Sequence, residues 1–210
     1  MKKKIVAAAL ACILCIGVGI GGTLAWLADK SAEVKNTFTY GDINIVLDES
    51  KLNADGTLDT ATRVQANTFK LVPGDTQAKD PMVTVKKGSE ACWLFVSVTA
   101  SSNYSTFMSD PVIADGWTLV PGESNVYYRE VAAVAADAEK DATFYVLGGT
   151  TNATGEVHVL DTVTKMMVNG LTAENYPTLT FQAYAVQKDN IATVADAWTQ
   201  AKTSANYPAA

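Results

Sequence analysis

The chain has 210 residues and carries 16 Lys and Arg residues against 22 acidic residues, which gives a formal charge of −6. An acidic surface repels phosphate backbones and anionic lipid, so the composition disfavours nucleic-acid binding. A single histidine and three cysteines leave few side chains for metal or disulfide chemistry.

The N-terminus has the charge pattern of a secretory leader. Residues 2–4 are lysines, and an uncharged run of 24 residues follows them and ends at Ala28. A positive start before an apolar run is typical of a signal peptide, and the small residues Thr23 and Ala25 favour cleavage between Ala25 and Trp26, with Ala28 as the second choice. The run is also long enough to cross a bilayer, so a permanent membrane anchor is the alternative.

Cleavage at Ala25 would define the mature protein. It removes three of the 16 Lys and Arg residues and none of the 22 acids, so the formal charge falls from −6 to −9. About 185 residues remain, enough for one domain with its own core. We expect a signal peptide over 1–25, a short segment over 26–36 and a folded domain over 37–210. Cys92 is then the one cysteine of the mature chain, so the fold depends on packing rather than on an internal disulfide.

Short strands separated by turns are predicted along most of the folded domain. The first strand is predicted over 37–47, and a polar loop follows over 50–60. Further strands are predicted over 69–72, 82–85, 91–99, 117–120, 126–131, 143–147, 156–163 and 177–187, and short helices over 104–108, 165–171 and 191–202. Many short strands with few helices favour an all-β fold, a jelly-roll-like β-sandwich.

Two of these strands have patterns that go beyond simple alternation. The stretch 91–99 is the most hydrophobic part of the mature chain, so we expect a central strand that is covered on both faces. The stretch 177–187 does not alternate strictly, which indicates either burial on both faces or a bulge near Gln182. The dipeptides Pro73-Gly74 and Pro121-Gly122 predict turns, because proline fixes one central φ and glycine supplies the positive one.

No catalytic constellation is recognisable in the sequence. His158 has no second histidine at zinc-ligand spacing, and no Gly-x-Ser-x-Gly elbow is present. Cys92 lies within an apolar strand, where a buried hydrophobic role is more common than a nucleophilic one. The stretch 53–56 resembles a calcium loop but has Lys51 and Thr62 where that loop needs acids, so it predicts a plain turn. We therefore expect neither a cofactor nor a metal.

Several motifs resemble the TasA and camelysin family. They are the glycine-rich end of the leader at 21–25, Asp29 shortly after the cut, the stretch 36–45, the Pro-Gly-Asp turn within 71–75 and the late strand over 178–186. The resemblance spans most of the chain in order. It implies a leader that is processed by the dedicated signal peptidase SipW and a secreted jelly-roll subunit of extracellular fibres in a biofilm matrix.

The resemblance also implies how such a subunit assembles with other copies of itself and with other matrix proteins. In the family's fibres the new N-terminal segment adds as a strand to the next subunit. The corresponding donor strand here consists of Trp26, Leu27, Ala28, Asp29, Lys30, Ser31, Ala32, Glu33, Val34 and Lys35. The expected function is structural and non-enzymatic. The alternatives are a camelysin-like metallopeptidase, by the family label alone, and an adhesive or binding module whose uncut leader holds it in the membrane.

Overall fold

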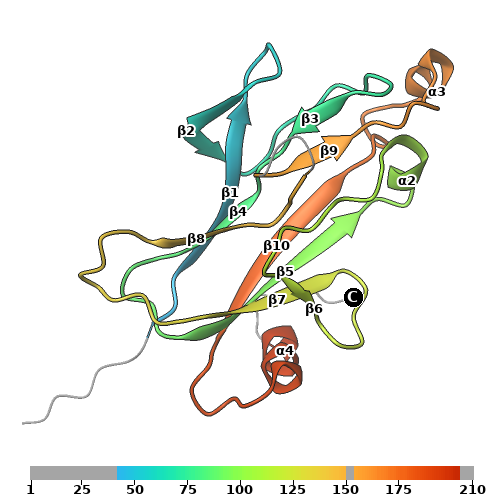
Figure 1. Ribbon diagram of the computed structural model, residues 1–210. Coiled ribbons are helices and arrows are strands. Elements are labelled where there is room, and N and C mark those ends of the chain that lie inside the picture. The colour runs from blue at the N-terminus through green and yellow to red at the C-terminus, as the bar shows by residue number, and fades with distance from the viewer. Residues whose placement is uncertain (1–41, 150–153, 204–210) are drawn as a thin grey trace, which may run out of the picture. The chain divides into compact units, whose positions relative to one another are not determined.

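The structure of the chain is a computed structural model that describes residues 42–149 and 154–203, all of which belong to one compact unit. Within this part of the chain, short antiparallel strands alternate with three short helices (Figure 1). The predicted all-β class is therefore confirmed. The predicted signal peptide over 1–25, the segment over 26–36 and the first residues of the predicted strand over 37–47 lie outside the described residues.

The first of two four-stranded sheets has the order β2-β1-β4-β8. β1 (Ile45–Leu52) pairs with β2 (Leu58–Val64) on one side and with β4 (Met82–Val85) on the other. β8 (Ala142–Tyr145) pairs with the far side of β4. All of these pairs are antiparallel, and β1 and β2 are joined by a short hairpin connection.

The hairpin of β1 and β2 replaces the polar loop that was predicted over 50–60. β1 continues through Leu52, and a turn closed by the hydrogen bond from the Asn53 amide to the Thr57 carbonyl (2.8 Å) leads directly into β2. The register shifts between Ser50 and Lys51, as at a β-bulge. The prediction was wrong because this hairpin is largely exposed, so its polar sequence reflects contact with water and not the absence of a strand.

The second sheet has the order β10-β5-β7-β6. β5 (Cys92–Ala100) lies between β10 (Leu179–Gln187) and β7 (Val126–Val131), and β6 (Thr118–Leu119) forms a hairpin with β7. The prediction of a central strand over 91–99 is confirmed. β10 pairs with β5 in one continuous register over its whole length, so burial on both faces, and not a bulge, explains its irregular pattern.

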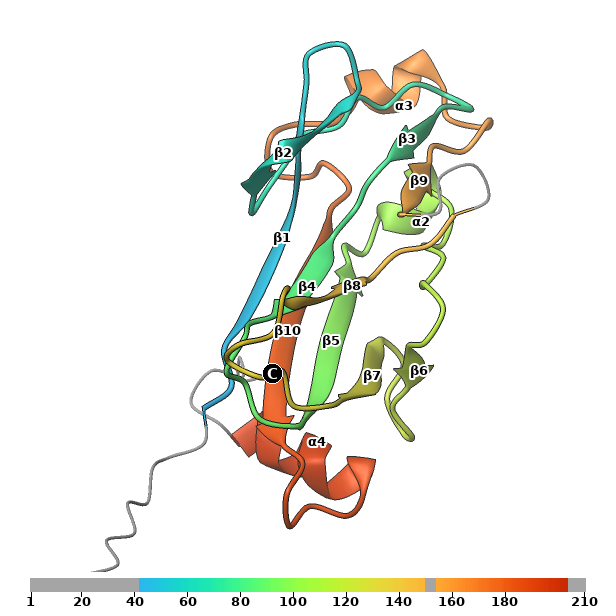
Figure 2. The same ribbon diagram turned by 60° about the vertical axis from the view of Figure 1, so that its left-hand side comes forward.

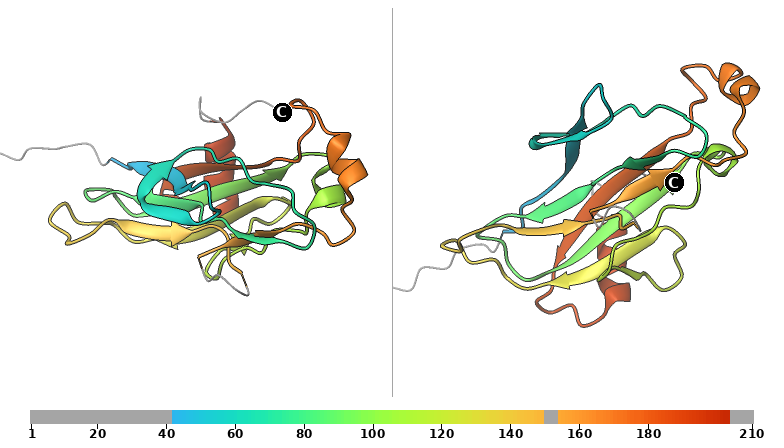
Figure 3. Two further views of the ribbon diagram at one scale, coloured as in Figure 1. Left: turned by 90° about the horizontal axis from the view of Figure 1, so that it is seen from above. Right: turned by 45° about the horizontal axis from the view of Figure 1, so that its top comes forward.

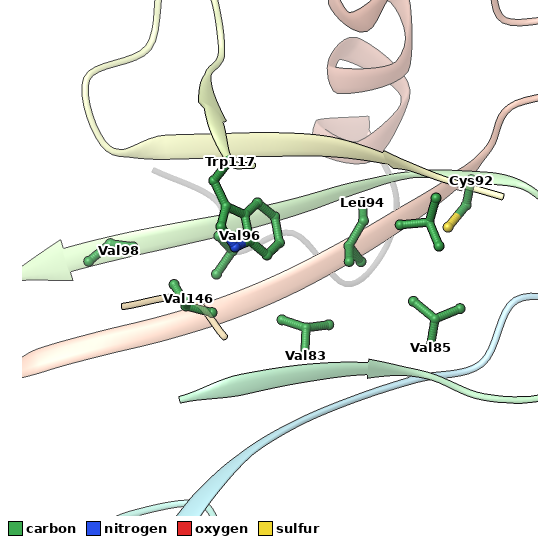
Figure 4. Close-up of a cluster of buried hydrophobic side chains, with 9 residues drawn as sticks. Val83, Val85, Cys92, Leu94, Val96, Val98, Trp117 and Val146 are labelled. Atoms are coloured by element: carbon green, nitrogen blue, oxygen red, sulfur yellow. The ribbon is translucent and has the colours of Figure 1, made fainter. Parts of the chain in front are cut away.

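The core lies between the two sheets (Figure 4). Val83 and Val85 of β4 are fully buried and point toward Leu94 and Val96 of β5, which are also fully buried. Cys92 lies at one end of the same cluster. The period of two along each strand directs alternate side chains to this interior. Valine is common there, because β-branched side chains pack well on a pleated sheet.

The other face of the second sheet is covered by α4 (Val194–Thr203). Trp198 of this helix packs on β5, with its ring centroid 5.1 Å from that of Phe95. Two shorter helices, α2 (Tyr104–Phe107) and α3 (Lys165–Asn169), lie near the start of β10, whereas α4 lies near its end (Figures 2 and 3). All three occur where short helices were predicted.

The remaining differences concern short segments near α3. The stretch 69–72 was predicted as a strand but has no strand pairing; a small sheet of β3 (Thr76–Ala78) and β9 (Glu156–His158) lies next to it instead. β9 also ends five residues earlier than predicted. The Pro73-Gly74 turn is confirmed, because Gly74 has φ 73° and the Asp75 amide donates to the Val72 carbonyl at 3.0 Å.

Candidate functional site

A groove lies along the edge of the two sheets that β1 and β10 form. Its volume is about 1270 Å³. The lining is mostly apolar and includes Ile45, Leu47, Phe69, Leu71, Leu179 and Phe181. Ordinary small-molecule pockets measure about 300–1,000 Å³, so this groove is large enough for a longer occupant.

The two bordering strands supply these side chains through their alternation. Ile45 and Leu47 leave β1 on the face directed at the core, and Leu179 and Phe181 leave β10 in the same way. All four are only partly buried, although they pack against the core cluster. The hydrophobic core therefore continues to the surface at this edge.

The strands that border the groove have limited pairing within residues 42–149 and 154–203. β2 covers β1 only from Glu49 onward, so the stretch from Ile45 to Asp48 pairs with β4 alone. β10 pairs with β5 and with no other described strand. Strand edges of this kind carry backbone donors and acceptors that can pair with an added strand.

A buried ion pair forms the polar wall of the groove. Lys79 Nζ lies 2.5 Å from Glu49 Oε2, and the two side chains are only 9% and 8% exposed. Lys79 Nζ also lies 4.9 Å and 5.5 Å from the ring centroids of Phe69 and Phe181. The Asn67 side chain donates to Glu49 Oε1 at 2.9 Å. These contacts satisfy both charges, so the pair shapes the groove without offering a free charge.

Tyr104 adds an unsatisfied polar group to the groove lining. Its side chain is 4% exposed, and its hydroxyl is buried without a hydrogen-bond partner. Burial, and to a smaller degree the charge of Asp110, raises the pKa of Tyr104 to about 12. A buried hydroxyl without a partner costs free energy, because water no longer solvates it.

The structure places Cys92 and His158, the two residues with catalytic potential in the sequence, on strands of different sheets. Cys92 is fully buried in the core, and burial raises the pKa of its thiol to about 11, which makes it a poor nucleophile. His158 lies on β9, where its Nδ1 is 3.0 Å from the Thr76 hydroxyl. No group of three or more metal-binding side chains occurs among the described residues.

The candidate calcium loop at 53–56 has the structure of a turn. The carboxylate of Asp55 accepts hydrogen bonds from the amide and the hydroxyl of Thr57, at 3.0 and 2.7 Å. Gly56 has φ 86°, as the turn requires. These hydrogen bonds lower the pKa of Asp55. The carboxylate therefore closes the turn in this structure.

The sites that were predicted from the sequence lie elsewhere in the chain. The cleavage site between Ala25 and Trp26 and the donor strand over 26–35 fall outside the described residues. Within residues 42–149 and 154–203, no helix is long and apolar enough to span a membrane. The groove was not predicted, because it depends on β1 and β10 meeting from opposite ends of the sequence; the alternation of apolar residues at 179–183 was its one local signal.

Comparison of the chain with protein-family models, with curated proteins and with solved structures finds no match in any of the three.

Proposed function

We propose that this protein is a secreted structural subunit that polymerises into extracellular fibres. In this proposal the two facing sheets form a jelly-roll-like β-sandwich, and the segment over 26–35 of one copy occupies the groove between β1 and β10 of the next. The observation that supports it most is the groove itself, an apolar opening bordered by two strands with limited pairing.

Addition of a strand would pair the free strand edges of the groove and cover its apolar lining. Main-chain hydrogen bonds to β1 or β10 would supply affinity, and alternate side chains would fill the apolar interior and fix the register. An extended segment of ten residues spans about 33 Å, which matches the length of a strand such as β10 with its nine residues. The occupant is therefore of the right size to run along the whole edge.

The composition of the segment over 26–35 is compatible with one face toward the groove. In an extended conformation Trp26, Ala28, Ala32 and Val34 lie on the same side, interrupted by Lys30. The opposite side carries mainly polar residues, as a solvent-facing side should. Cleavage of the leader would release Trp26 for this contact, which makes processing the step that permits assembly.

The geometry of the contact determines the form of the assembly. The donor segment and the groove are different surfaces of one chain, so the contact is head-to-tail and leaves a free groove at one end and a free segment at the other. A contact of this type that does not close into a ring grows a filament. Localisation outside the cell and processing by a peptidase of the SipW type belong to the same proposal.

Electron microscopy of two purified forms tests this proposal. One form begins at Trp26 and the other at Asn36. We expect filaments only from the longer form, and we expect a synthetic peptide of residues 26–35 to bind the shorter form and to block growth of the longer one. A scrambled peptide of the same composition is the control. Filaments from both forms would place the polymer contact elsewhere, and a monomeric longer form at all concentrations would refute the function.

A matched pair of substitutions tests whether the groove is the acceptor. Leu179→Glu places a charge in the groove, whereas Leu119→Glu places the same charge on β6, where Leu119 is 44% exposed. We expect only Leu179→Glu to abolish peptide binding and filaments, with both variants folded by circular dichroism. Equal effects of the two substitutions would contradict the assignment of the groove.

A further inference from the structure

A second pocket lies at the other edge of the two sheets, between β7 and β8, and its volume is about 520 Å³. Arg129 of β7 and Phe144 of β8 line it together with the segment over 112–115. On β7, Arg129 shares its face with Tyr127 and with the buried Val131, both of which pack in the core cluster between the sheets. An arginine is thus directed inward at a position where an apolar residue would be expected.

Stacking on aromatic rings holds the guanidinium of Arg129. Its central carbon lies 3.9 Å from the ring centroid of Phe144 and 5.3 Å from that of Trp117. Gly116 makes room for it: the residue has φ 85°, and a Cβ there would lie 3.0 Å from Arg129 Nη2. Stacking uses the faces of the planar group and leaves the N–H donors along its rim available to a ligand.

These donors have no acceptor in the part of the chain that the structure describes. Arg129 Nε is buried without a hydrogen-bond partner, and none of the ion pairs among the described residues includes this side chain. The other arginine of the sequence, Arg63, forms ion pairs with Asp48 at 2.8 Å and Asp80 at 3.0 Å. Burial lowers the pKa of Arg129. A partly desolvated cation without a counter-charge favours an anionic ligand.

We propose that this pocket binds a carboxylate attached to an apolar or aromatic group. The two oxygens of a carboxylate match the fork of guanidinium donors. Val112 and Tyr145 line the same pocket and are 55% and 38% exposed, so they offer apolar surface to the rest of the ligand. A free aromatic acid and the C-terminal residue of a peptide both have this chemistry. The inference does not depend on fibre formation.

Asp115 modulates the charge of the pocket. It lines the pocket and is exposed, and it forms no ion pair with Arg129 in this structure. Its negative charge opposes an incoming carboxylate and opposes a doubly charged phosphate more strongly. The pocket should therefore prefer monovalent carboxylates, and Asp115→Asn should tighten their binding.

Equilibrium dialysis of the full mature protein tests the proposal, because this measurement works for monomers and for filaments. The probes are radiolabelled benzoate for the free acid and acetyl-phenylalanine for the peptide terminus, with benzamide as the uncharged isostere. We expect saturable binding of a carboxylate with millimolar affinity and none of benzamide. A preference between the two acids identifies the source. Absence of saturable binding by either acid, or equal binding of benzamide, would overturn the proposal.

Matched variants assign the binding to this pocket. Arg129→Lys keeps the charge but loses the donor fork, so we expect binding to weaken about tenfold. Arg63→Lys makes the same change in an arginine that already has partners, and binding should be unchanged. Asp115→Asn should strengthen binding, and it keeps the test decisive if the Arg129 variant does not fold. Equal effects of the two arginine variants, or weaker binding by Asp115→Asn, would contradict the assignment.

Discussion

The two edges of the sheet pair differ in whether another segment of the chain covers them. At the edge of β7 and β8, the segment over 112–117 covers the opening: the Ala114 amide donates to the Val146 carbonyl at 3.0 Å, and the Trp117 indole donates to the Tyr145 carbonyl at 2.8 Å. At the edge of β1 and β10, no described segment pairs along the opening, and an apolar groove remains.

This contrast concerns which edge could accept a second chain in the proposed assembly. An edge that is covered by its own chain has its backbone groups satisfied and cannot accept another strand. Trp117, at the end of the covering segment, is buried, with 9% of its surface exposed. At the opposite edge, Leu179 and Phe181 are only partly buried. We infer that the groove is the edge that a second chain would complete.

The largest expected effect comes from opening the covered edge. Trp117→Ala removes a core side chain and its hydrogen bond to the Tyr145 carbonyl, so we expect the free energy of unfolding to fall by about 3–5 kcal/mol. Denaturant unfolding followed by circular dichroism measures this loss. Tyr176→Ala, at a groove residue that is 51% exposed, is the control and should change it by less than about 0.5 kcal/mol. A similar loss in both variants would remove the distinction between the edges.

The next largest expected effect is a loss of stability at alkaline pH, which results from ionisation of Tyr104 in the groove lining. The pKa of Tyr104 is raised from 10.0 to about 12 in the folded protein, so between these values the folded state keeps a proton that the unfolded state loses. The free energy of unfolding should therefore be independent of this group below pH 10 and should fall as the pH rises from 10 through 12, because the folded state must then bury a phenolate; two pKa units correspond to about 2.7 kcal/mol. Tyr104→Phe should remove this part of the pH dependence in unfolding titrations.

A second prediction for Tyr104→Phe concerns its stability at neutral pH. The Tyr104 hydroxyl is buried without a partner, so Tyr104→Phe should leave the stability unchanged or raise it by up to about 1 kcal/mol. Cys92, whose pKa is raised by burial, adds a similar alkaline loss, so both measurements belong in a Cys92→Ala background. A clear loss of stability at neutral pH would mean that the hydroxyl has a partner in solution.

A further expected effect concerns the turn at the covered edge. Gly116→Ala introduces a Cβ at φ 85° and 3.0 Å from Arg129 Nη2, so we expect a loss of about 1–2 kcal/mol and a displaced guanidinium. Denaturant unfolding measures the stability, and equilibrium dialysis with benzoate measures whether the guanidinium still binds a carboxylate. Gly122→Ala is the matched control, because Gly122 has φ 86° and open space around its Cβ position. Carboxylate binding should weaken only in the Gly116 variant.

Local sequence determined the strands whose side chains alternate strongly and whose turns have a defined chemistry. β5 was predictable as a central strand because apolar residues occupy both of its faces, and the hairpin of β6 and β7 was predictable from its Pro-Gly turn. The β1–β2 hairpin was missed, because an exposed strand carries polar residues just as a loop does. The leader and the segment over 26–35 remain predictions from charge and hydropathy alone.

Tertiary structure alone decided where functional surfaces arise. The groove joins residues near 45 to residues near 180. The buried pair of Glu49 and Lys79 on its wall likewise joins two residues that lie outside the predicted strands and 30 positions apart in the sequence. The sequence likewise indicates only that Arg129 lies on a strand. The pairing register of that strand places its side chain against Phe144 of the other sheet. The physical reason is that sequence periodicity specifies which face of a strand is apolar, whereas the pairing of distant strands decides which of those faces remains uncovered.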